Sequence, residues 1–217
     1  MTAHDLPASD SATWTPDGLP ARDVLNVRDL PTYAFGHRSI MWWATLGLMV
    51  IESTVFALAV MTYFYLRSLS ADWPINAIAP DLLWGTVNTV ILLLSAIPNH
   101  FAKREAERLN RVRARNWLLV CLLSAILFLA VRAFEFATLN VSWTLNAYGS
   151  IVWLLLGLHT VHLLTDTIDT SVLTVLLYTG PLEGKRYVDV SENAAYWYFV
   201  VVSWLPIYAV IYWAPRW

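Results

Sequence analysis

The chain has 217 residues, of which 58% are hydrophobic and only 14% are charged, and its net charge is −2. A soluble domain carries about 25% charged residues, so this composition excludes an ordinary soluble protein and indicates a membrane protein. The small net charge argues against nucleic-acid binding, which needs a broad basic face. A single cysteine, Cys121, excludes an internal disulfide and any site built from several thiolates.

Residues 1–36 differ from the rest of the chain, because they are polar and contain five aspartates and four prolines. No basic region precedes a hydrophobic stretch there, so we do not expect a cleavable signal peptide. We expect a polar cytoplasmic tail that is extended and becomes ordered only where it lies on a partner or on basic loops. A leader without any role is the alternative.

Residues 37–217 are predicted to form an all-α integral membrane domain with five transmembrane helices. The hydrophobic windows are residues 40–66, 82–101, 117–139, 148–178 and 194–213. Each is long enough to cross a hydrocarbon core of about 30 Å at about 1.5 Å per residue. Backbone groups in lipid must find partners within their own segment, which favours helices, and no alternating pattern indicates a β-barrel.

The distribution of lysine and arginine predicts the orientation of these helices. Eleven of the fourteen basic residues lie in the tail up to the first helix, in the run KREAERLNRVRAR at 103–115, and at Lys185 and Arg186. Arg67 and Arg216 lie on the other side. By the positive-inside rule, the N-terminus is cytoplasmic and the C-terminus is periplasmic.

Ionisable residues inside a membrane are costly there and point to function. Glu52 lies halfway along the first helix. Arg132 and Glu135 lie three residues apart in the third helix, so they share a face and are expected to pair. The fourth helix carries a stripe of four ionisable residues at offsets 0, 3, 7 and 10, and these are His159, His162, Asp166 and Asp169.

Two imidazoles and two carboxylates are suitable ligands for iron, manganese or zinc. An offset of ten residues spans about 15 Å of helix, however, so the four side chains cannot reach one ion. We therefore expect no metal site, and expect these side chains to face the bundle interior. No phosphate-binding loop, nucleophile elbow or haem-attachment motif occurs. The residues alone predict a polytopic membrane subunit, with a free-standing transporter as the alternative.

Motifs in five ordered segments add a family resemblance. They lie within residues 52–67, 83–95, 132–136, 148–162 and 192–204. The first contains a glutamate, a following Phe56 and a closing Tyr-x-Tyr-Leu-Arg; the third, Arg-Ala-Phe-Glu-Phe, is similar to Gln-Ala-Tyr-Glu-Tyr. Together the segments resemble subunit III of the haem–copper oxidases, the group that includes cytochrome c and quinol oxidases.

The resemblance implies a non-catalytic subunit of a proton-translocating respiratory oxidase in a bacterial cytoplasmic membrane. Such a subunit packs against the catalytic subunit I, beside the other subunits of the complex, and supports proton uptake. It holds phospholipids between helices 1–2 and helices 3–5, which form a V. No haem, copper or other metal is expected on this chain, since those cofactors are expected on partner subunits.

Departures from the family pattern leave the type of complex open. Tyr198 stands where the family has histidine, Val201 where it has aspartate, Asp166 where it has glycine, and Asp169 is an addition. These changes mark a divergent branch. An accessory subunit of a quinol oxidase or of a nitric oxide reductase complex is therefore an alternative.

The resemblance also implies two sets of site residues. The lipid-binding set combines aromatic residues with cations, namely Trp42, Trp43, Trp84, Arg67, Lys185 and Arg186; alternatively, these cations only snorkel to bulk lipid. Glu52 occupies the family's carbodiimide-reactive position and His162 its second histidine. We expect these two to face each other near the membrane midplane, with His159 or Asp166 beside them. Such a pair either holds and relays a proton or only locks the first helix to the fourth.

Overall fold

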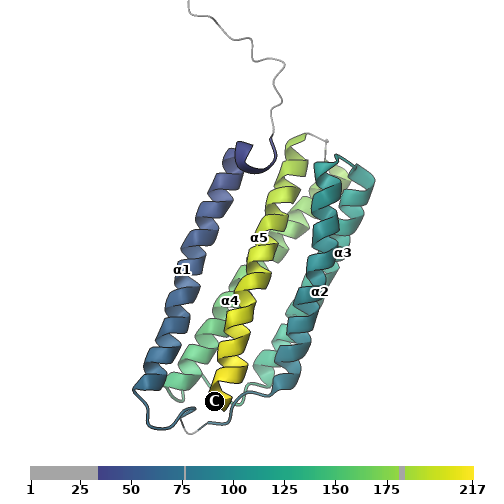
Figure 1. The fold of residues 1–217 in the computed structure, drawn as a ribbon. Coiled ribbons are helices and arrows are strands. Elements are labelled where there is room, and N and C mark those ends of the chain that lie inside the picture. Colours follow the sequence, from purple (N-terminus) through teal and green to yellow (C-terminus); the bar gives the residue numbers. More distant parts are fainter. Residues whose placement is uncertain (1–33, 76, 181–183) are drawn as a thin grey trace, which may run out of the picture. The chain divides into compact units, whose positions relative to one another are not determined.

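The computed structural model describes residues 34–75, 77–180 and 184–217, and within these ranges all of its regular structure is helical (Figure 1). Most of the expected polar tail therefore lies outside the described residues. A 3-10 turn at Gly36–Arg38 precedes five long helices, which are α1 (Ile40–Ser68), α2 (Leu82–Glu107), α3 (Arg111–Ala137), α4 (Ala147–Thr179) and α5 (Gly184–Tyr208). A π-helical turn at Ala209–Trp213 and a 3-10 turn at Ala214–Arg216 continue α5.

All five helices are long and apolar enough to cross a membrane, which confirms the predicted all-α membrane class. Several helices extend beyond their hydrophobic windows: α2 continues to Glu107, α3 begins at Arg111, and α5 begins at Gly184. The backbone of a helix forms its hydrogen bonds within the helix, whatever its side chains are. A helix can therefore continue through polar sequence at the membrane surface. Hydropathy marks where the apolar side chains end, and the helix ends elsewhere.

The basic run at 103–115 is therefore mostly helical, and only a short turn separates α2 from α3. The Leu109 amide donates to the Ala106 carbonyl at 2.9 Å, and the Asn110 amide donates to the Glu105 carbonyl at 3.0 Å. This pair of bonds ends α2 in a Schellman motif, with Leu109 in the left-handed region at φ 56°. The Asn110 side chain then accepts from the Arg113 amide and caps the start of α3.

The α2–α3 turn makes the two helices antiparallel neighbours. Ala102, Ala106 and Ala114, which are completely buried, lie near this turn, where small side chains let helix backbones approach closely. Beyond the turn, Arg111 donates through Nε and Nη2 to the Leu177 carbonyl near the end of α4, at 3.4 and 3.3 Å. A cation near the last carbonyls of a helix also interacts favourably with its dipole. The basic run thus joins α3 to α4.

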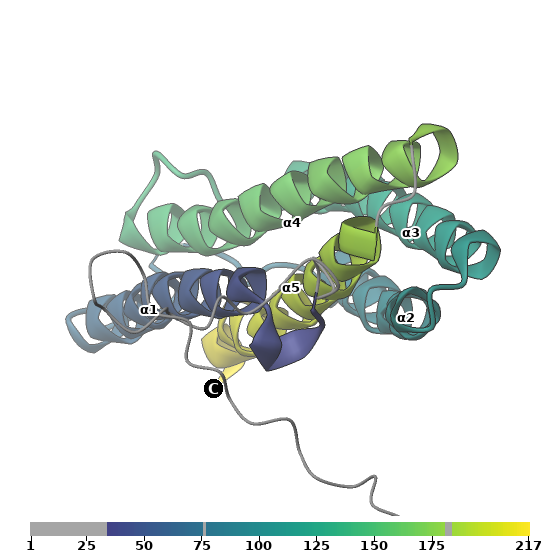
Figure 2. The same cartoon turned by 90° about the horizontal axis from the view of Figure 1, so that it is seen from above.

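The helix packing places α5 between α1 and α2, with α4 and α3 behind them (Figures 1 and 2). α5 contacts α1, α2 and α4, and α1 packs against α4 and α5. The most extensive packing of α2 is with α3. The expected grouping of helices 1–2 against helices 3–5 differs from this arrangement, because the short turn binds α2 to α3.

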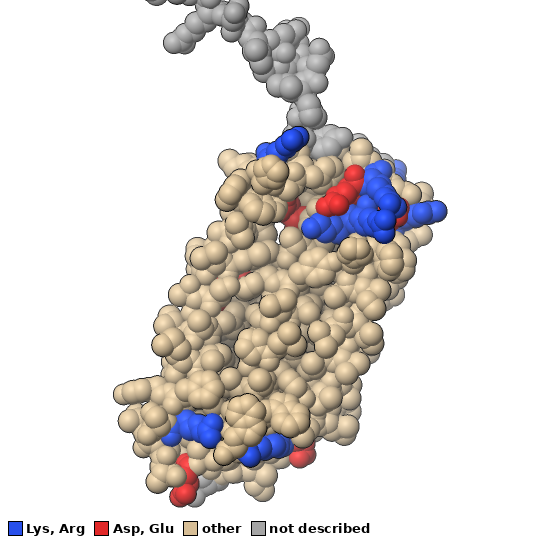
Figure 3. Space-filling view, viewed as in Figure 1, with Lys and Arg blue, Asp and Glu red and all other residues tan. Residues whose placement is uncertain are grey.

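The charged side chains lie mainly at the two ends of the described domain. Figure 3 shows lysine and arginine gathered at the end where α2 finishes and α3 begins, and an almost uncharged band across the middle of the visible face. Fewer basic side chains lie at the opposite end of the visible face (Figure 3). Arg67, in the last turn of α1, and Arg216, in the C-terminal 3-10 turn, belong to that end. An uncharged band between polar ends is what a membrane-spanning domain requires.

Candidate functional site

A polar contact joins three helices near the middle of α1. Nε2 of His162 on α4 lies 3.4 Å from Oε1 of Glu52 on α1. The Tyr196 hydroxyl on α5 donates a 2.8 Å hydrogen bond to Oε2 of the same carboxylate. Phe56 follows Glu52 by one turn of α1, and the centroid of its ring lies 4.9 Å from the centroid of the His162 ring. The structure thus brings together Glu52 and His162, and adds Tyr196, which the sequence reasoning did not name.

The hydrogen bonds of His162 indicate which of its nitrogen atoms carries a proton. Nδ1 lies 2.6 Å from the Leu158 carbonyl oxygen, which only accepts, so Nδ1 is the donor. Nε2 then faces a carboxylate oxygen of Glu52. Two acceptors at that distance attract only when a proton sits on Nε2 or on the carboxylate. The geometry of the Glu52–His162 pair therefore suits it to hold one proton.

His159 lies on the same helix but makes its hydrogen bonds elsewhere. Its Nε2 lies 3.1 Å from the Val200 carbonyl of α5, and its Nδ1 lies 3.4 Å from Nη2 of Arg132 on α3. Three residues advance a helix by about 300°, so His159 and His162 point about 60° apart. The stripe that the sequence predicts is therefore split between two clusters.

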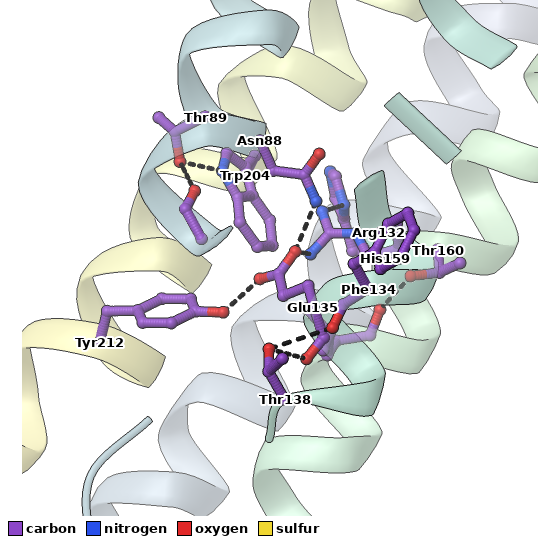
Figure 4. Close-up of polar contacts among 12 residues, drawn as sticks. Asn88, Thr89, Arg132, Phe134, Glu135, Thr138, His159, Thr160, Trp204 and Tyr212 are labelled. Carbon is purple, nitrogen blue, oxygen red and sulfur yellow. Dashed lines mark hydrogen bonds and ion pairs between the residues drawn. The ribbon is translucent and has the colours of Figure 1, made fainter. Parts of the chain in front are cut away.

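The second cluster is centred on the expected Arg132–Glu135 pair (Figure 4). Nη1 of Arg132 lies 2.8 Å from Oε2 of Glu135, and both side chains are 1% exposed. The Asn88 amide of α2 donates to the same oxygen at 2.5 Å, and the Tyr212 hydroxyl donates to Oε1. The carboxylate of Glu135 thus accepts hydrogen bonds from three parts of the chain. These contacts hold α2, α3 and the C-terminal turn together.

Aromatic side chains enclose the Arg132 guanidinium. Its central carbon lies 4.8 Å from the Phe128 ring centroid and 4.1 Å from that of Trp204. The Trp204 indole donates to the Thr89 hydroxyl at 2.8 Å, and this hydroxyl donates to the Gly85 carbonyl at 2.7 Å. A buried charge that is paired, bonded and covered by ring faces is stabilised in place. This cluster therefore has the features of a structural lock, by which we mean a set of contacts that fixes α2, α3 and the C-terminal turn relative to one another.

A cavity of about 590 Å³ opens between α1, α4 and α5 on the basic side of Glu52. Its lining runs from Met41 in the first turn of α1 to Glu52, which is about 16 Å along that helix. The ionisable side chains that line it are five carboxyl groups and one guanidinium, namely Glu52, Asp166, Asp169, Asp189, Glu192 and Arg186. The cavity is therefore strongly acidic.

Asn193 holds two of these carboxylates in place. In the amide orientation that satisfies its neighbours, its nitrogen donates to Asp169 at 2.9 Å and to Asp166 at 3.3 Å, and its oxygen accepts from Thr170 at 2.9 Å. One oxygen of Asp166 and one of Glu192 nevertheless have no hydrogen-bond partner among the described residues. Asp166 and Glu192 are only 3% and 7% exposed. Asp166 thus shares a cavity with Glu52, and it lies about two turns along α4 from His159 and the Arg132 cluster.

The side chains expected to bind lipid lie at both ends of the domain. Trp42 and Trp43, in the first turn of α1, contact edge to face with centroids 4.9 Å apart. Lys185 and Arg186 lie in the first turn of α5, where Arg186 is 3.7 Å from Asp189. These four residues belong to the basic end of the domain.

Arg67 and Trp84 belong to the opposite end of the domain. Arg67 lies in the last turn of α1, and Trp84 lies in the first turn of α2. The Trp84 ring stacks on Phe134 of α3, with centroids 5.6 Å apart. The residues expected to bind lipid therefore lie at the two ends of the described domain.

Sequence reasoning missed several polar partners in these clusters. Asn88, Tyr212 and Tyr196 each donate to a glutamate on another helix. Asn88 is a polar residue inside a hydrophobic helix, which is a signal in itself, whereas a tyrosine in such a helix is common. Among the residues that the structure describes, no group of three or more His, Cys, Asp or Glu side chains is arranged to hold a metal ion.

Comparisons with known proteins place these clusters in a family. The cytochrome c oxidase subunit III family matches residues 36–216. The chain is 28% identical over 174 residues to a cytochrome c oxidase subunit 3 of Pylaiella littoralis, covering 76% of this chain and 64% of that relative. It is 25% identical over 179 residues to one of Synechocystis sp., covering 82% and 77%.

A fungal relative matches this chain with a similar identity and coverage. The chain is 30% identical over 175 residues to a cytochrome c oxidase subunit 3 of Trichophyton rubrum, covering 76% of this chain and 65% of that relative. The chain thus spans just under two thirds of the Pylaiella and Trichophyton proteins. The family match includes all five long helices and every residue of both polar clusters. The chain belongs to the cytochrome c oxidase subunit III family.

Proposed function

We propose that this chain is a non-catalytic subunit III of a haem–copper oxidase of the cytochrome c oxidase type. The family match over residues 36–216 is the observation that carries this proposal. Electron transfer to oxygen, and the haem and copper that perform it, belong to partner subunits. This chain packs against subunit I, holds phospholipids and supports proton uptake. We place it in a bacterial cytoplasmic membrane, with the start of α1 on the cytoplasmic side.

The surface of α1 supports a role in contact with lipids or other subunits. Within α1, all of which the structure describes, only Phe56, Ala59 and Tyr63 are buried. Large apolar side chains along its other faces, such as Ile51 and Leu58, are 65% and 58% exposed. Apolar surface of this extent needs lipid chains or another membrane subunit against it.

The Glu52–His162 pair supports the role in proton uptake. With Nδ1 of His162 bonded to Leu158, the contact between Nε2 and Glu52 needs one proton. An intramembrane pair that holds one proton can supply or buffer protons for a partner that consumes them. Glu52 and His162 then tune proton supply to subunit I, and the chemistry of oxygen stays on that subunit.

Purification of the chain with its native partners tests the proposal. The full chain, tagged at its C-terminus, is extracted from its own membranes in mild detergent, and reduced-minus-oxidised difference spectra of the purified material are recorded. We expect haem bands and oxygen consumption with reduced cytochrome c. A chain that purifies alone and without haem would contradict the proposal and favour a free-standing transporter.

The same preparation distinguishes the remaining types of complex. Oxygen consumption with a quinol, and none with cytochrome c, identifies a quinol oxidase. Consumption of nitric oxide, with no consumption of oxygen, identifies a nitric oxide reductase assembly. Either of these two outcomes replaces the cytochrome c oxidase assignment.

A further inference from the structure

The acidic cavity between α1, α4 and α5 is a further site, distinct from the Glu52–His162 contact at its inner end. Five carboxyl groups line it, and Arg186 is the one Lys or Arg in its lining among the residues that the structure describes. Outside the lining, Lys103 of α2 and Cys121 of α3 lie within electrostatic reach of Glu192 and Asp166. A cavity with this excess of carboxyl groups attracts protons and cations.

Two residues that line the cavity each have a buried carboxylate oxygen without a partner. One oxygen each of Asp166 and Glu192 has no hydrogen-bond partner in the described part of the chain, although the two residues are 3% and 7% exposed. Buried carboxylate oxygens without a partner are costly, so such groups are nearly always bonded to protein or to water. The volume of about 590 Å³ is ample for many water molecules beside these groups.

The carboxyl groups are spaced along the cavity from its basic end to its inner end. Asp189, beside Arg186, lies near the start of α5, and Glu192 follows about one turn deeper. On α4, Asp169 and Asp166 are joined by Asn193 and lie about 4.5 Å apart along the axis. Glu52 closes the inner end, where it contacts His162.

We propose that this cavity is filled with water and passes protons between the aqueous phase at the basic end and the Glu52–His162 pair, with Asp166 as the intermediate group. A proton from water binds a carboxylate near the opening, moves through water to Asp166, and then reaches Glu52 or Nε2 of His162. Each donor is left as a carboxylate and takes a new proton from the water outside. Only the final use of these protons rests on the proposed oxidase function.

Side-specific thiol labelling tests whether water fills the cavity. Cys121 is buried and is replaced by alanine, and a single cysteine is placed at Thr165, which lines the cavity, or at Leu164 as the matched control. Leu164 is the preceding residue at the same depth, is 48% exposed, and is not part of the cavity lining. Both variants of the full chain are studied in membrane vesicles of known orientation with a charged methanethiosulfonate that cannot cross the bilayer.

We expect Thr165→Cys to react at least about tenfold faster than Leu164→Cys, since a thiolate forms readily only where water reaches it. The reaction should occur only with reagent added on the side where α1 begins. A membrane-permeant maleimide checks that both thiols are present and folded in the same way. Equal rates with the charged reagent, or reaction from the opposite side, would overturn the proposed hydrated cavity.

A second experiment tests whether Asp166 passes protons. The purified chain in lipid nanodiscs is subjected to a pH jump, and protonation of Glu52 is followed by its carboxyl infrared band, assigned with Glu52→Gln. We expect Asp166→Asn to slow this protonation at least tenfold and Asp166→Glu to restore it. Glu105→Gln, which changes a carboxyl on α2 that does not line the cavity, should leave the rate unchanged.

Wild-type rates in Asp166→Asn would show that protons bypass Asp166 and would refute its assigned role. An unchanged rate in that variant together with saturable slowing of Thr165→Cys labelling by ethanolamine would show instead that the cavity binds an ammonium group. None of these measurements requires an oxidase. A chain that purifies without haem therefore refutes the proposed function alone, and the cavity proposal keeps its own test.

Discussion

Tyr196 of α5 donates its hydroxyl to Glu52 of α1 across 2.8 Å, although the two residues lie 144 positions apart in the chain. Because Glu52 also faces His162, a single carboxylate connects α1 to both α4 and α5. α1 buries few side chains, so these polar contacts form an important part of its attachment to the other helices.

Replacing Tyr196 with phenylalanine removes the hydroxyl and keeps the ring. We expect Tyr196→Phe to lower the free energy of unfolding by about 1 kcal/mol, the usual contribution of one hydrogen bond. Unfolding by sodium dodecyl sulfate in mixed micelles, followed by circular dichroism, measures this change. Tyr65→Phe, at a ring on α1 that is 63% exposed, is the control and should have no effect. Equal stability of the two variants would contradict the prediction.

Glu52→Gln separates the two roles that remain open for the Glu52–His162 pair. If the pair relays protons, the complex assembles normally but turns over more slowly or inactivates sooner at high pH, because glutamine cannot take up a proton. If the pair only locks α1 to α4, assembly weakens and turnover per intact complex stays unchanged. Turnover normalised to haem content, measured across pH, distinguishes the two. We expect the first result, and normal turnover at every pH would exclude the relay.

Arg132→Met breaks the buried pair of the second cluster and leaves Glu135 without its cation. We expect a loss of about 3–5 kcal/mol, since one uncompensated buried charge is strongly destabilising. The exposed Arg108, 3.4 Å from Glu105, provides a matched control, and Arg108→Met should cost only about 0–1 kcal/mol. The free energy of unfolding in mixed micelles measures both variants. A loss under about 1 kcal/mol in Arg132→Met would show that the cluster does not act as a lock.

Two glycines in membrane helices give a contrasting pair of substitutions. A Cβ added at Gly85 would overlap the ring of Tyr212, whereas one added at Gly157 would meet open space. We expect Gly85→Ala to cost about 1–3 kcal/mol through overpacking. Gly157→Ala should be neutral or stabilising by up to about 1 kcal/mol, because alanine favours helix. Thermal unfolding in detergent tests both, and a stable Gly85→Ala would show that Tyr212 moves aside freely.

The turn between α2 and α3 contains a residue in an unfavourable conformation. Leu109 has φ 56°, a region that glycine adopts readily and other residues do not. We expect Leu109→Gly to raise the free energy of unfolding by about 0.5–1 kcal/mol, after allowance for the greater freedom of glycine in the unfolded chain. Leu109→Ala keeps a Cβ and should gain nothing. Melting temperatures of the two variants in the same detergent provide the comparison.

The membrane fold was predictable from the sequence because hydropathy alone distinguishes five apolar segments. The ends of the helices were not, since α2 and α3 continue through charged sequence and stop at a turn defined by backbone hydrogen bonds. The packing order was not predictable either. Which helices pair depends on turn length and on small residues such as Ala102 and Ala106, whose effect appears only when the helices are placed together.

Part of the site was predictable because ionisable side chains are energetically costly inside a membrane and therefore stand out in an apolar segment. These side chains are Glu52, His162 and the Arg132–Glu135 pair. Helical periodicity placed His159 on the same stripe as His162, but a 60° difference in direction is enough to send the two imidazoles to different neighbours. The acidic cavity escaped the sequence reasoning because Asp189 and Glu192 lie before the apolar window of α5. Their approach to Asp166 depends on how α5 crosses α4.

The attachment of α1 has a consequence for biogenesis. Its polar partners, His162 and Tyr196, lie on the fourth and fifth helices, and are therefore synthesised long after α1 has emerged. Until then, α1 holds an ionisable side chain in lipid without its final neighbours, which is energetically costly. The two contacts of Glu52 can therefore be complete only after α5 has been synthesised. A chaperone or a subunit that meets the chain earlier encounters α1 as a free helix.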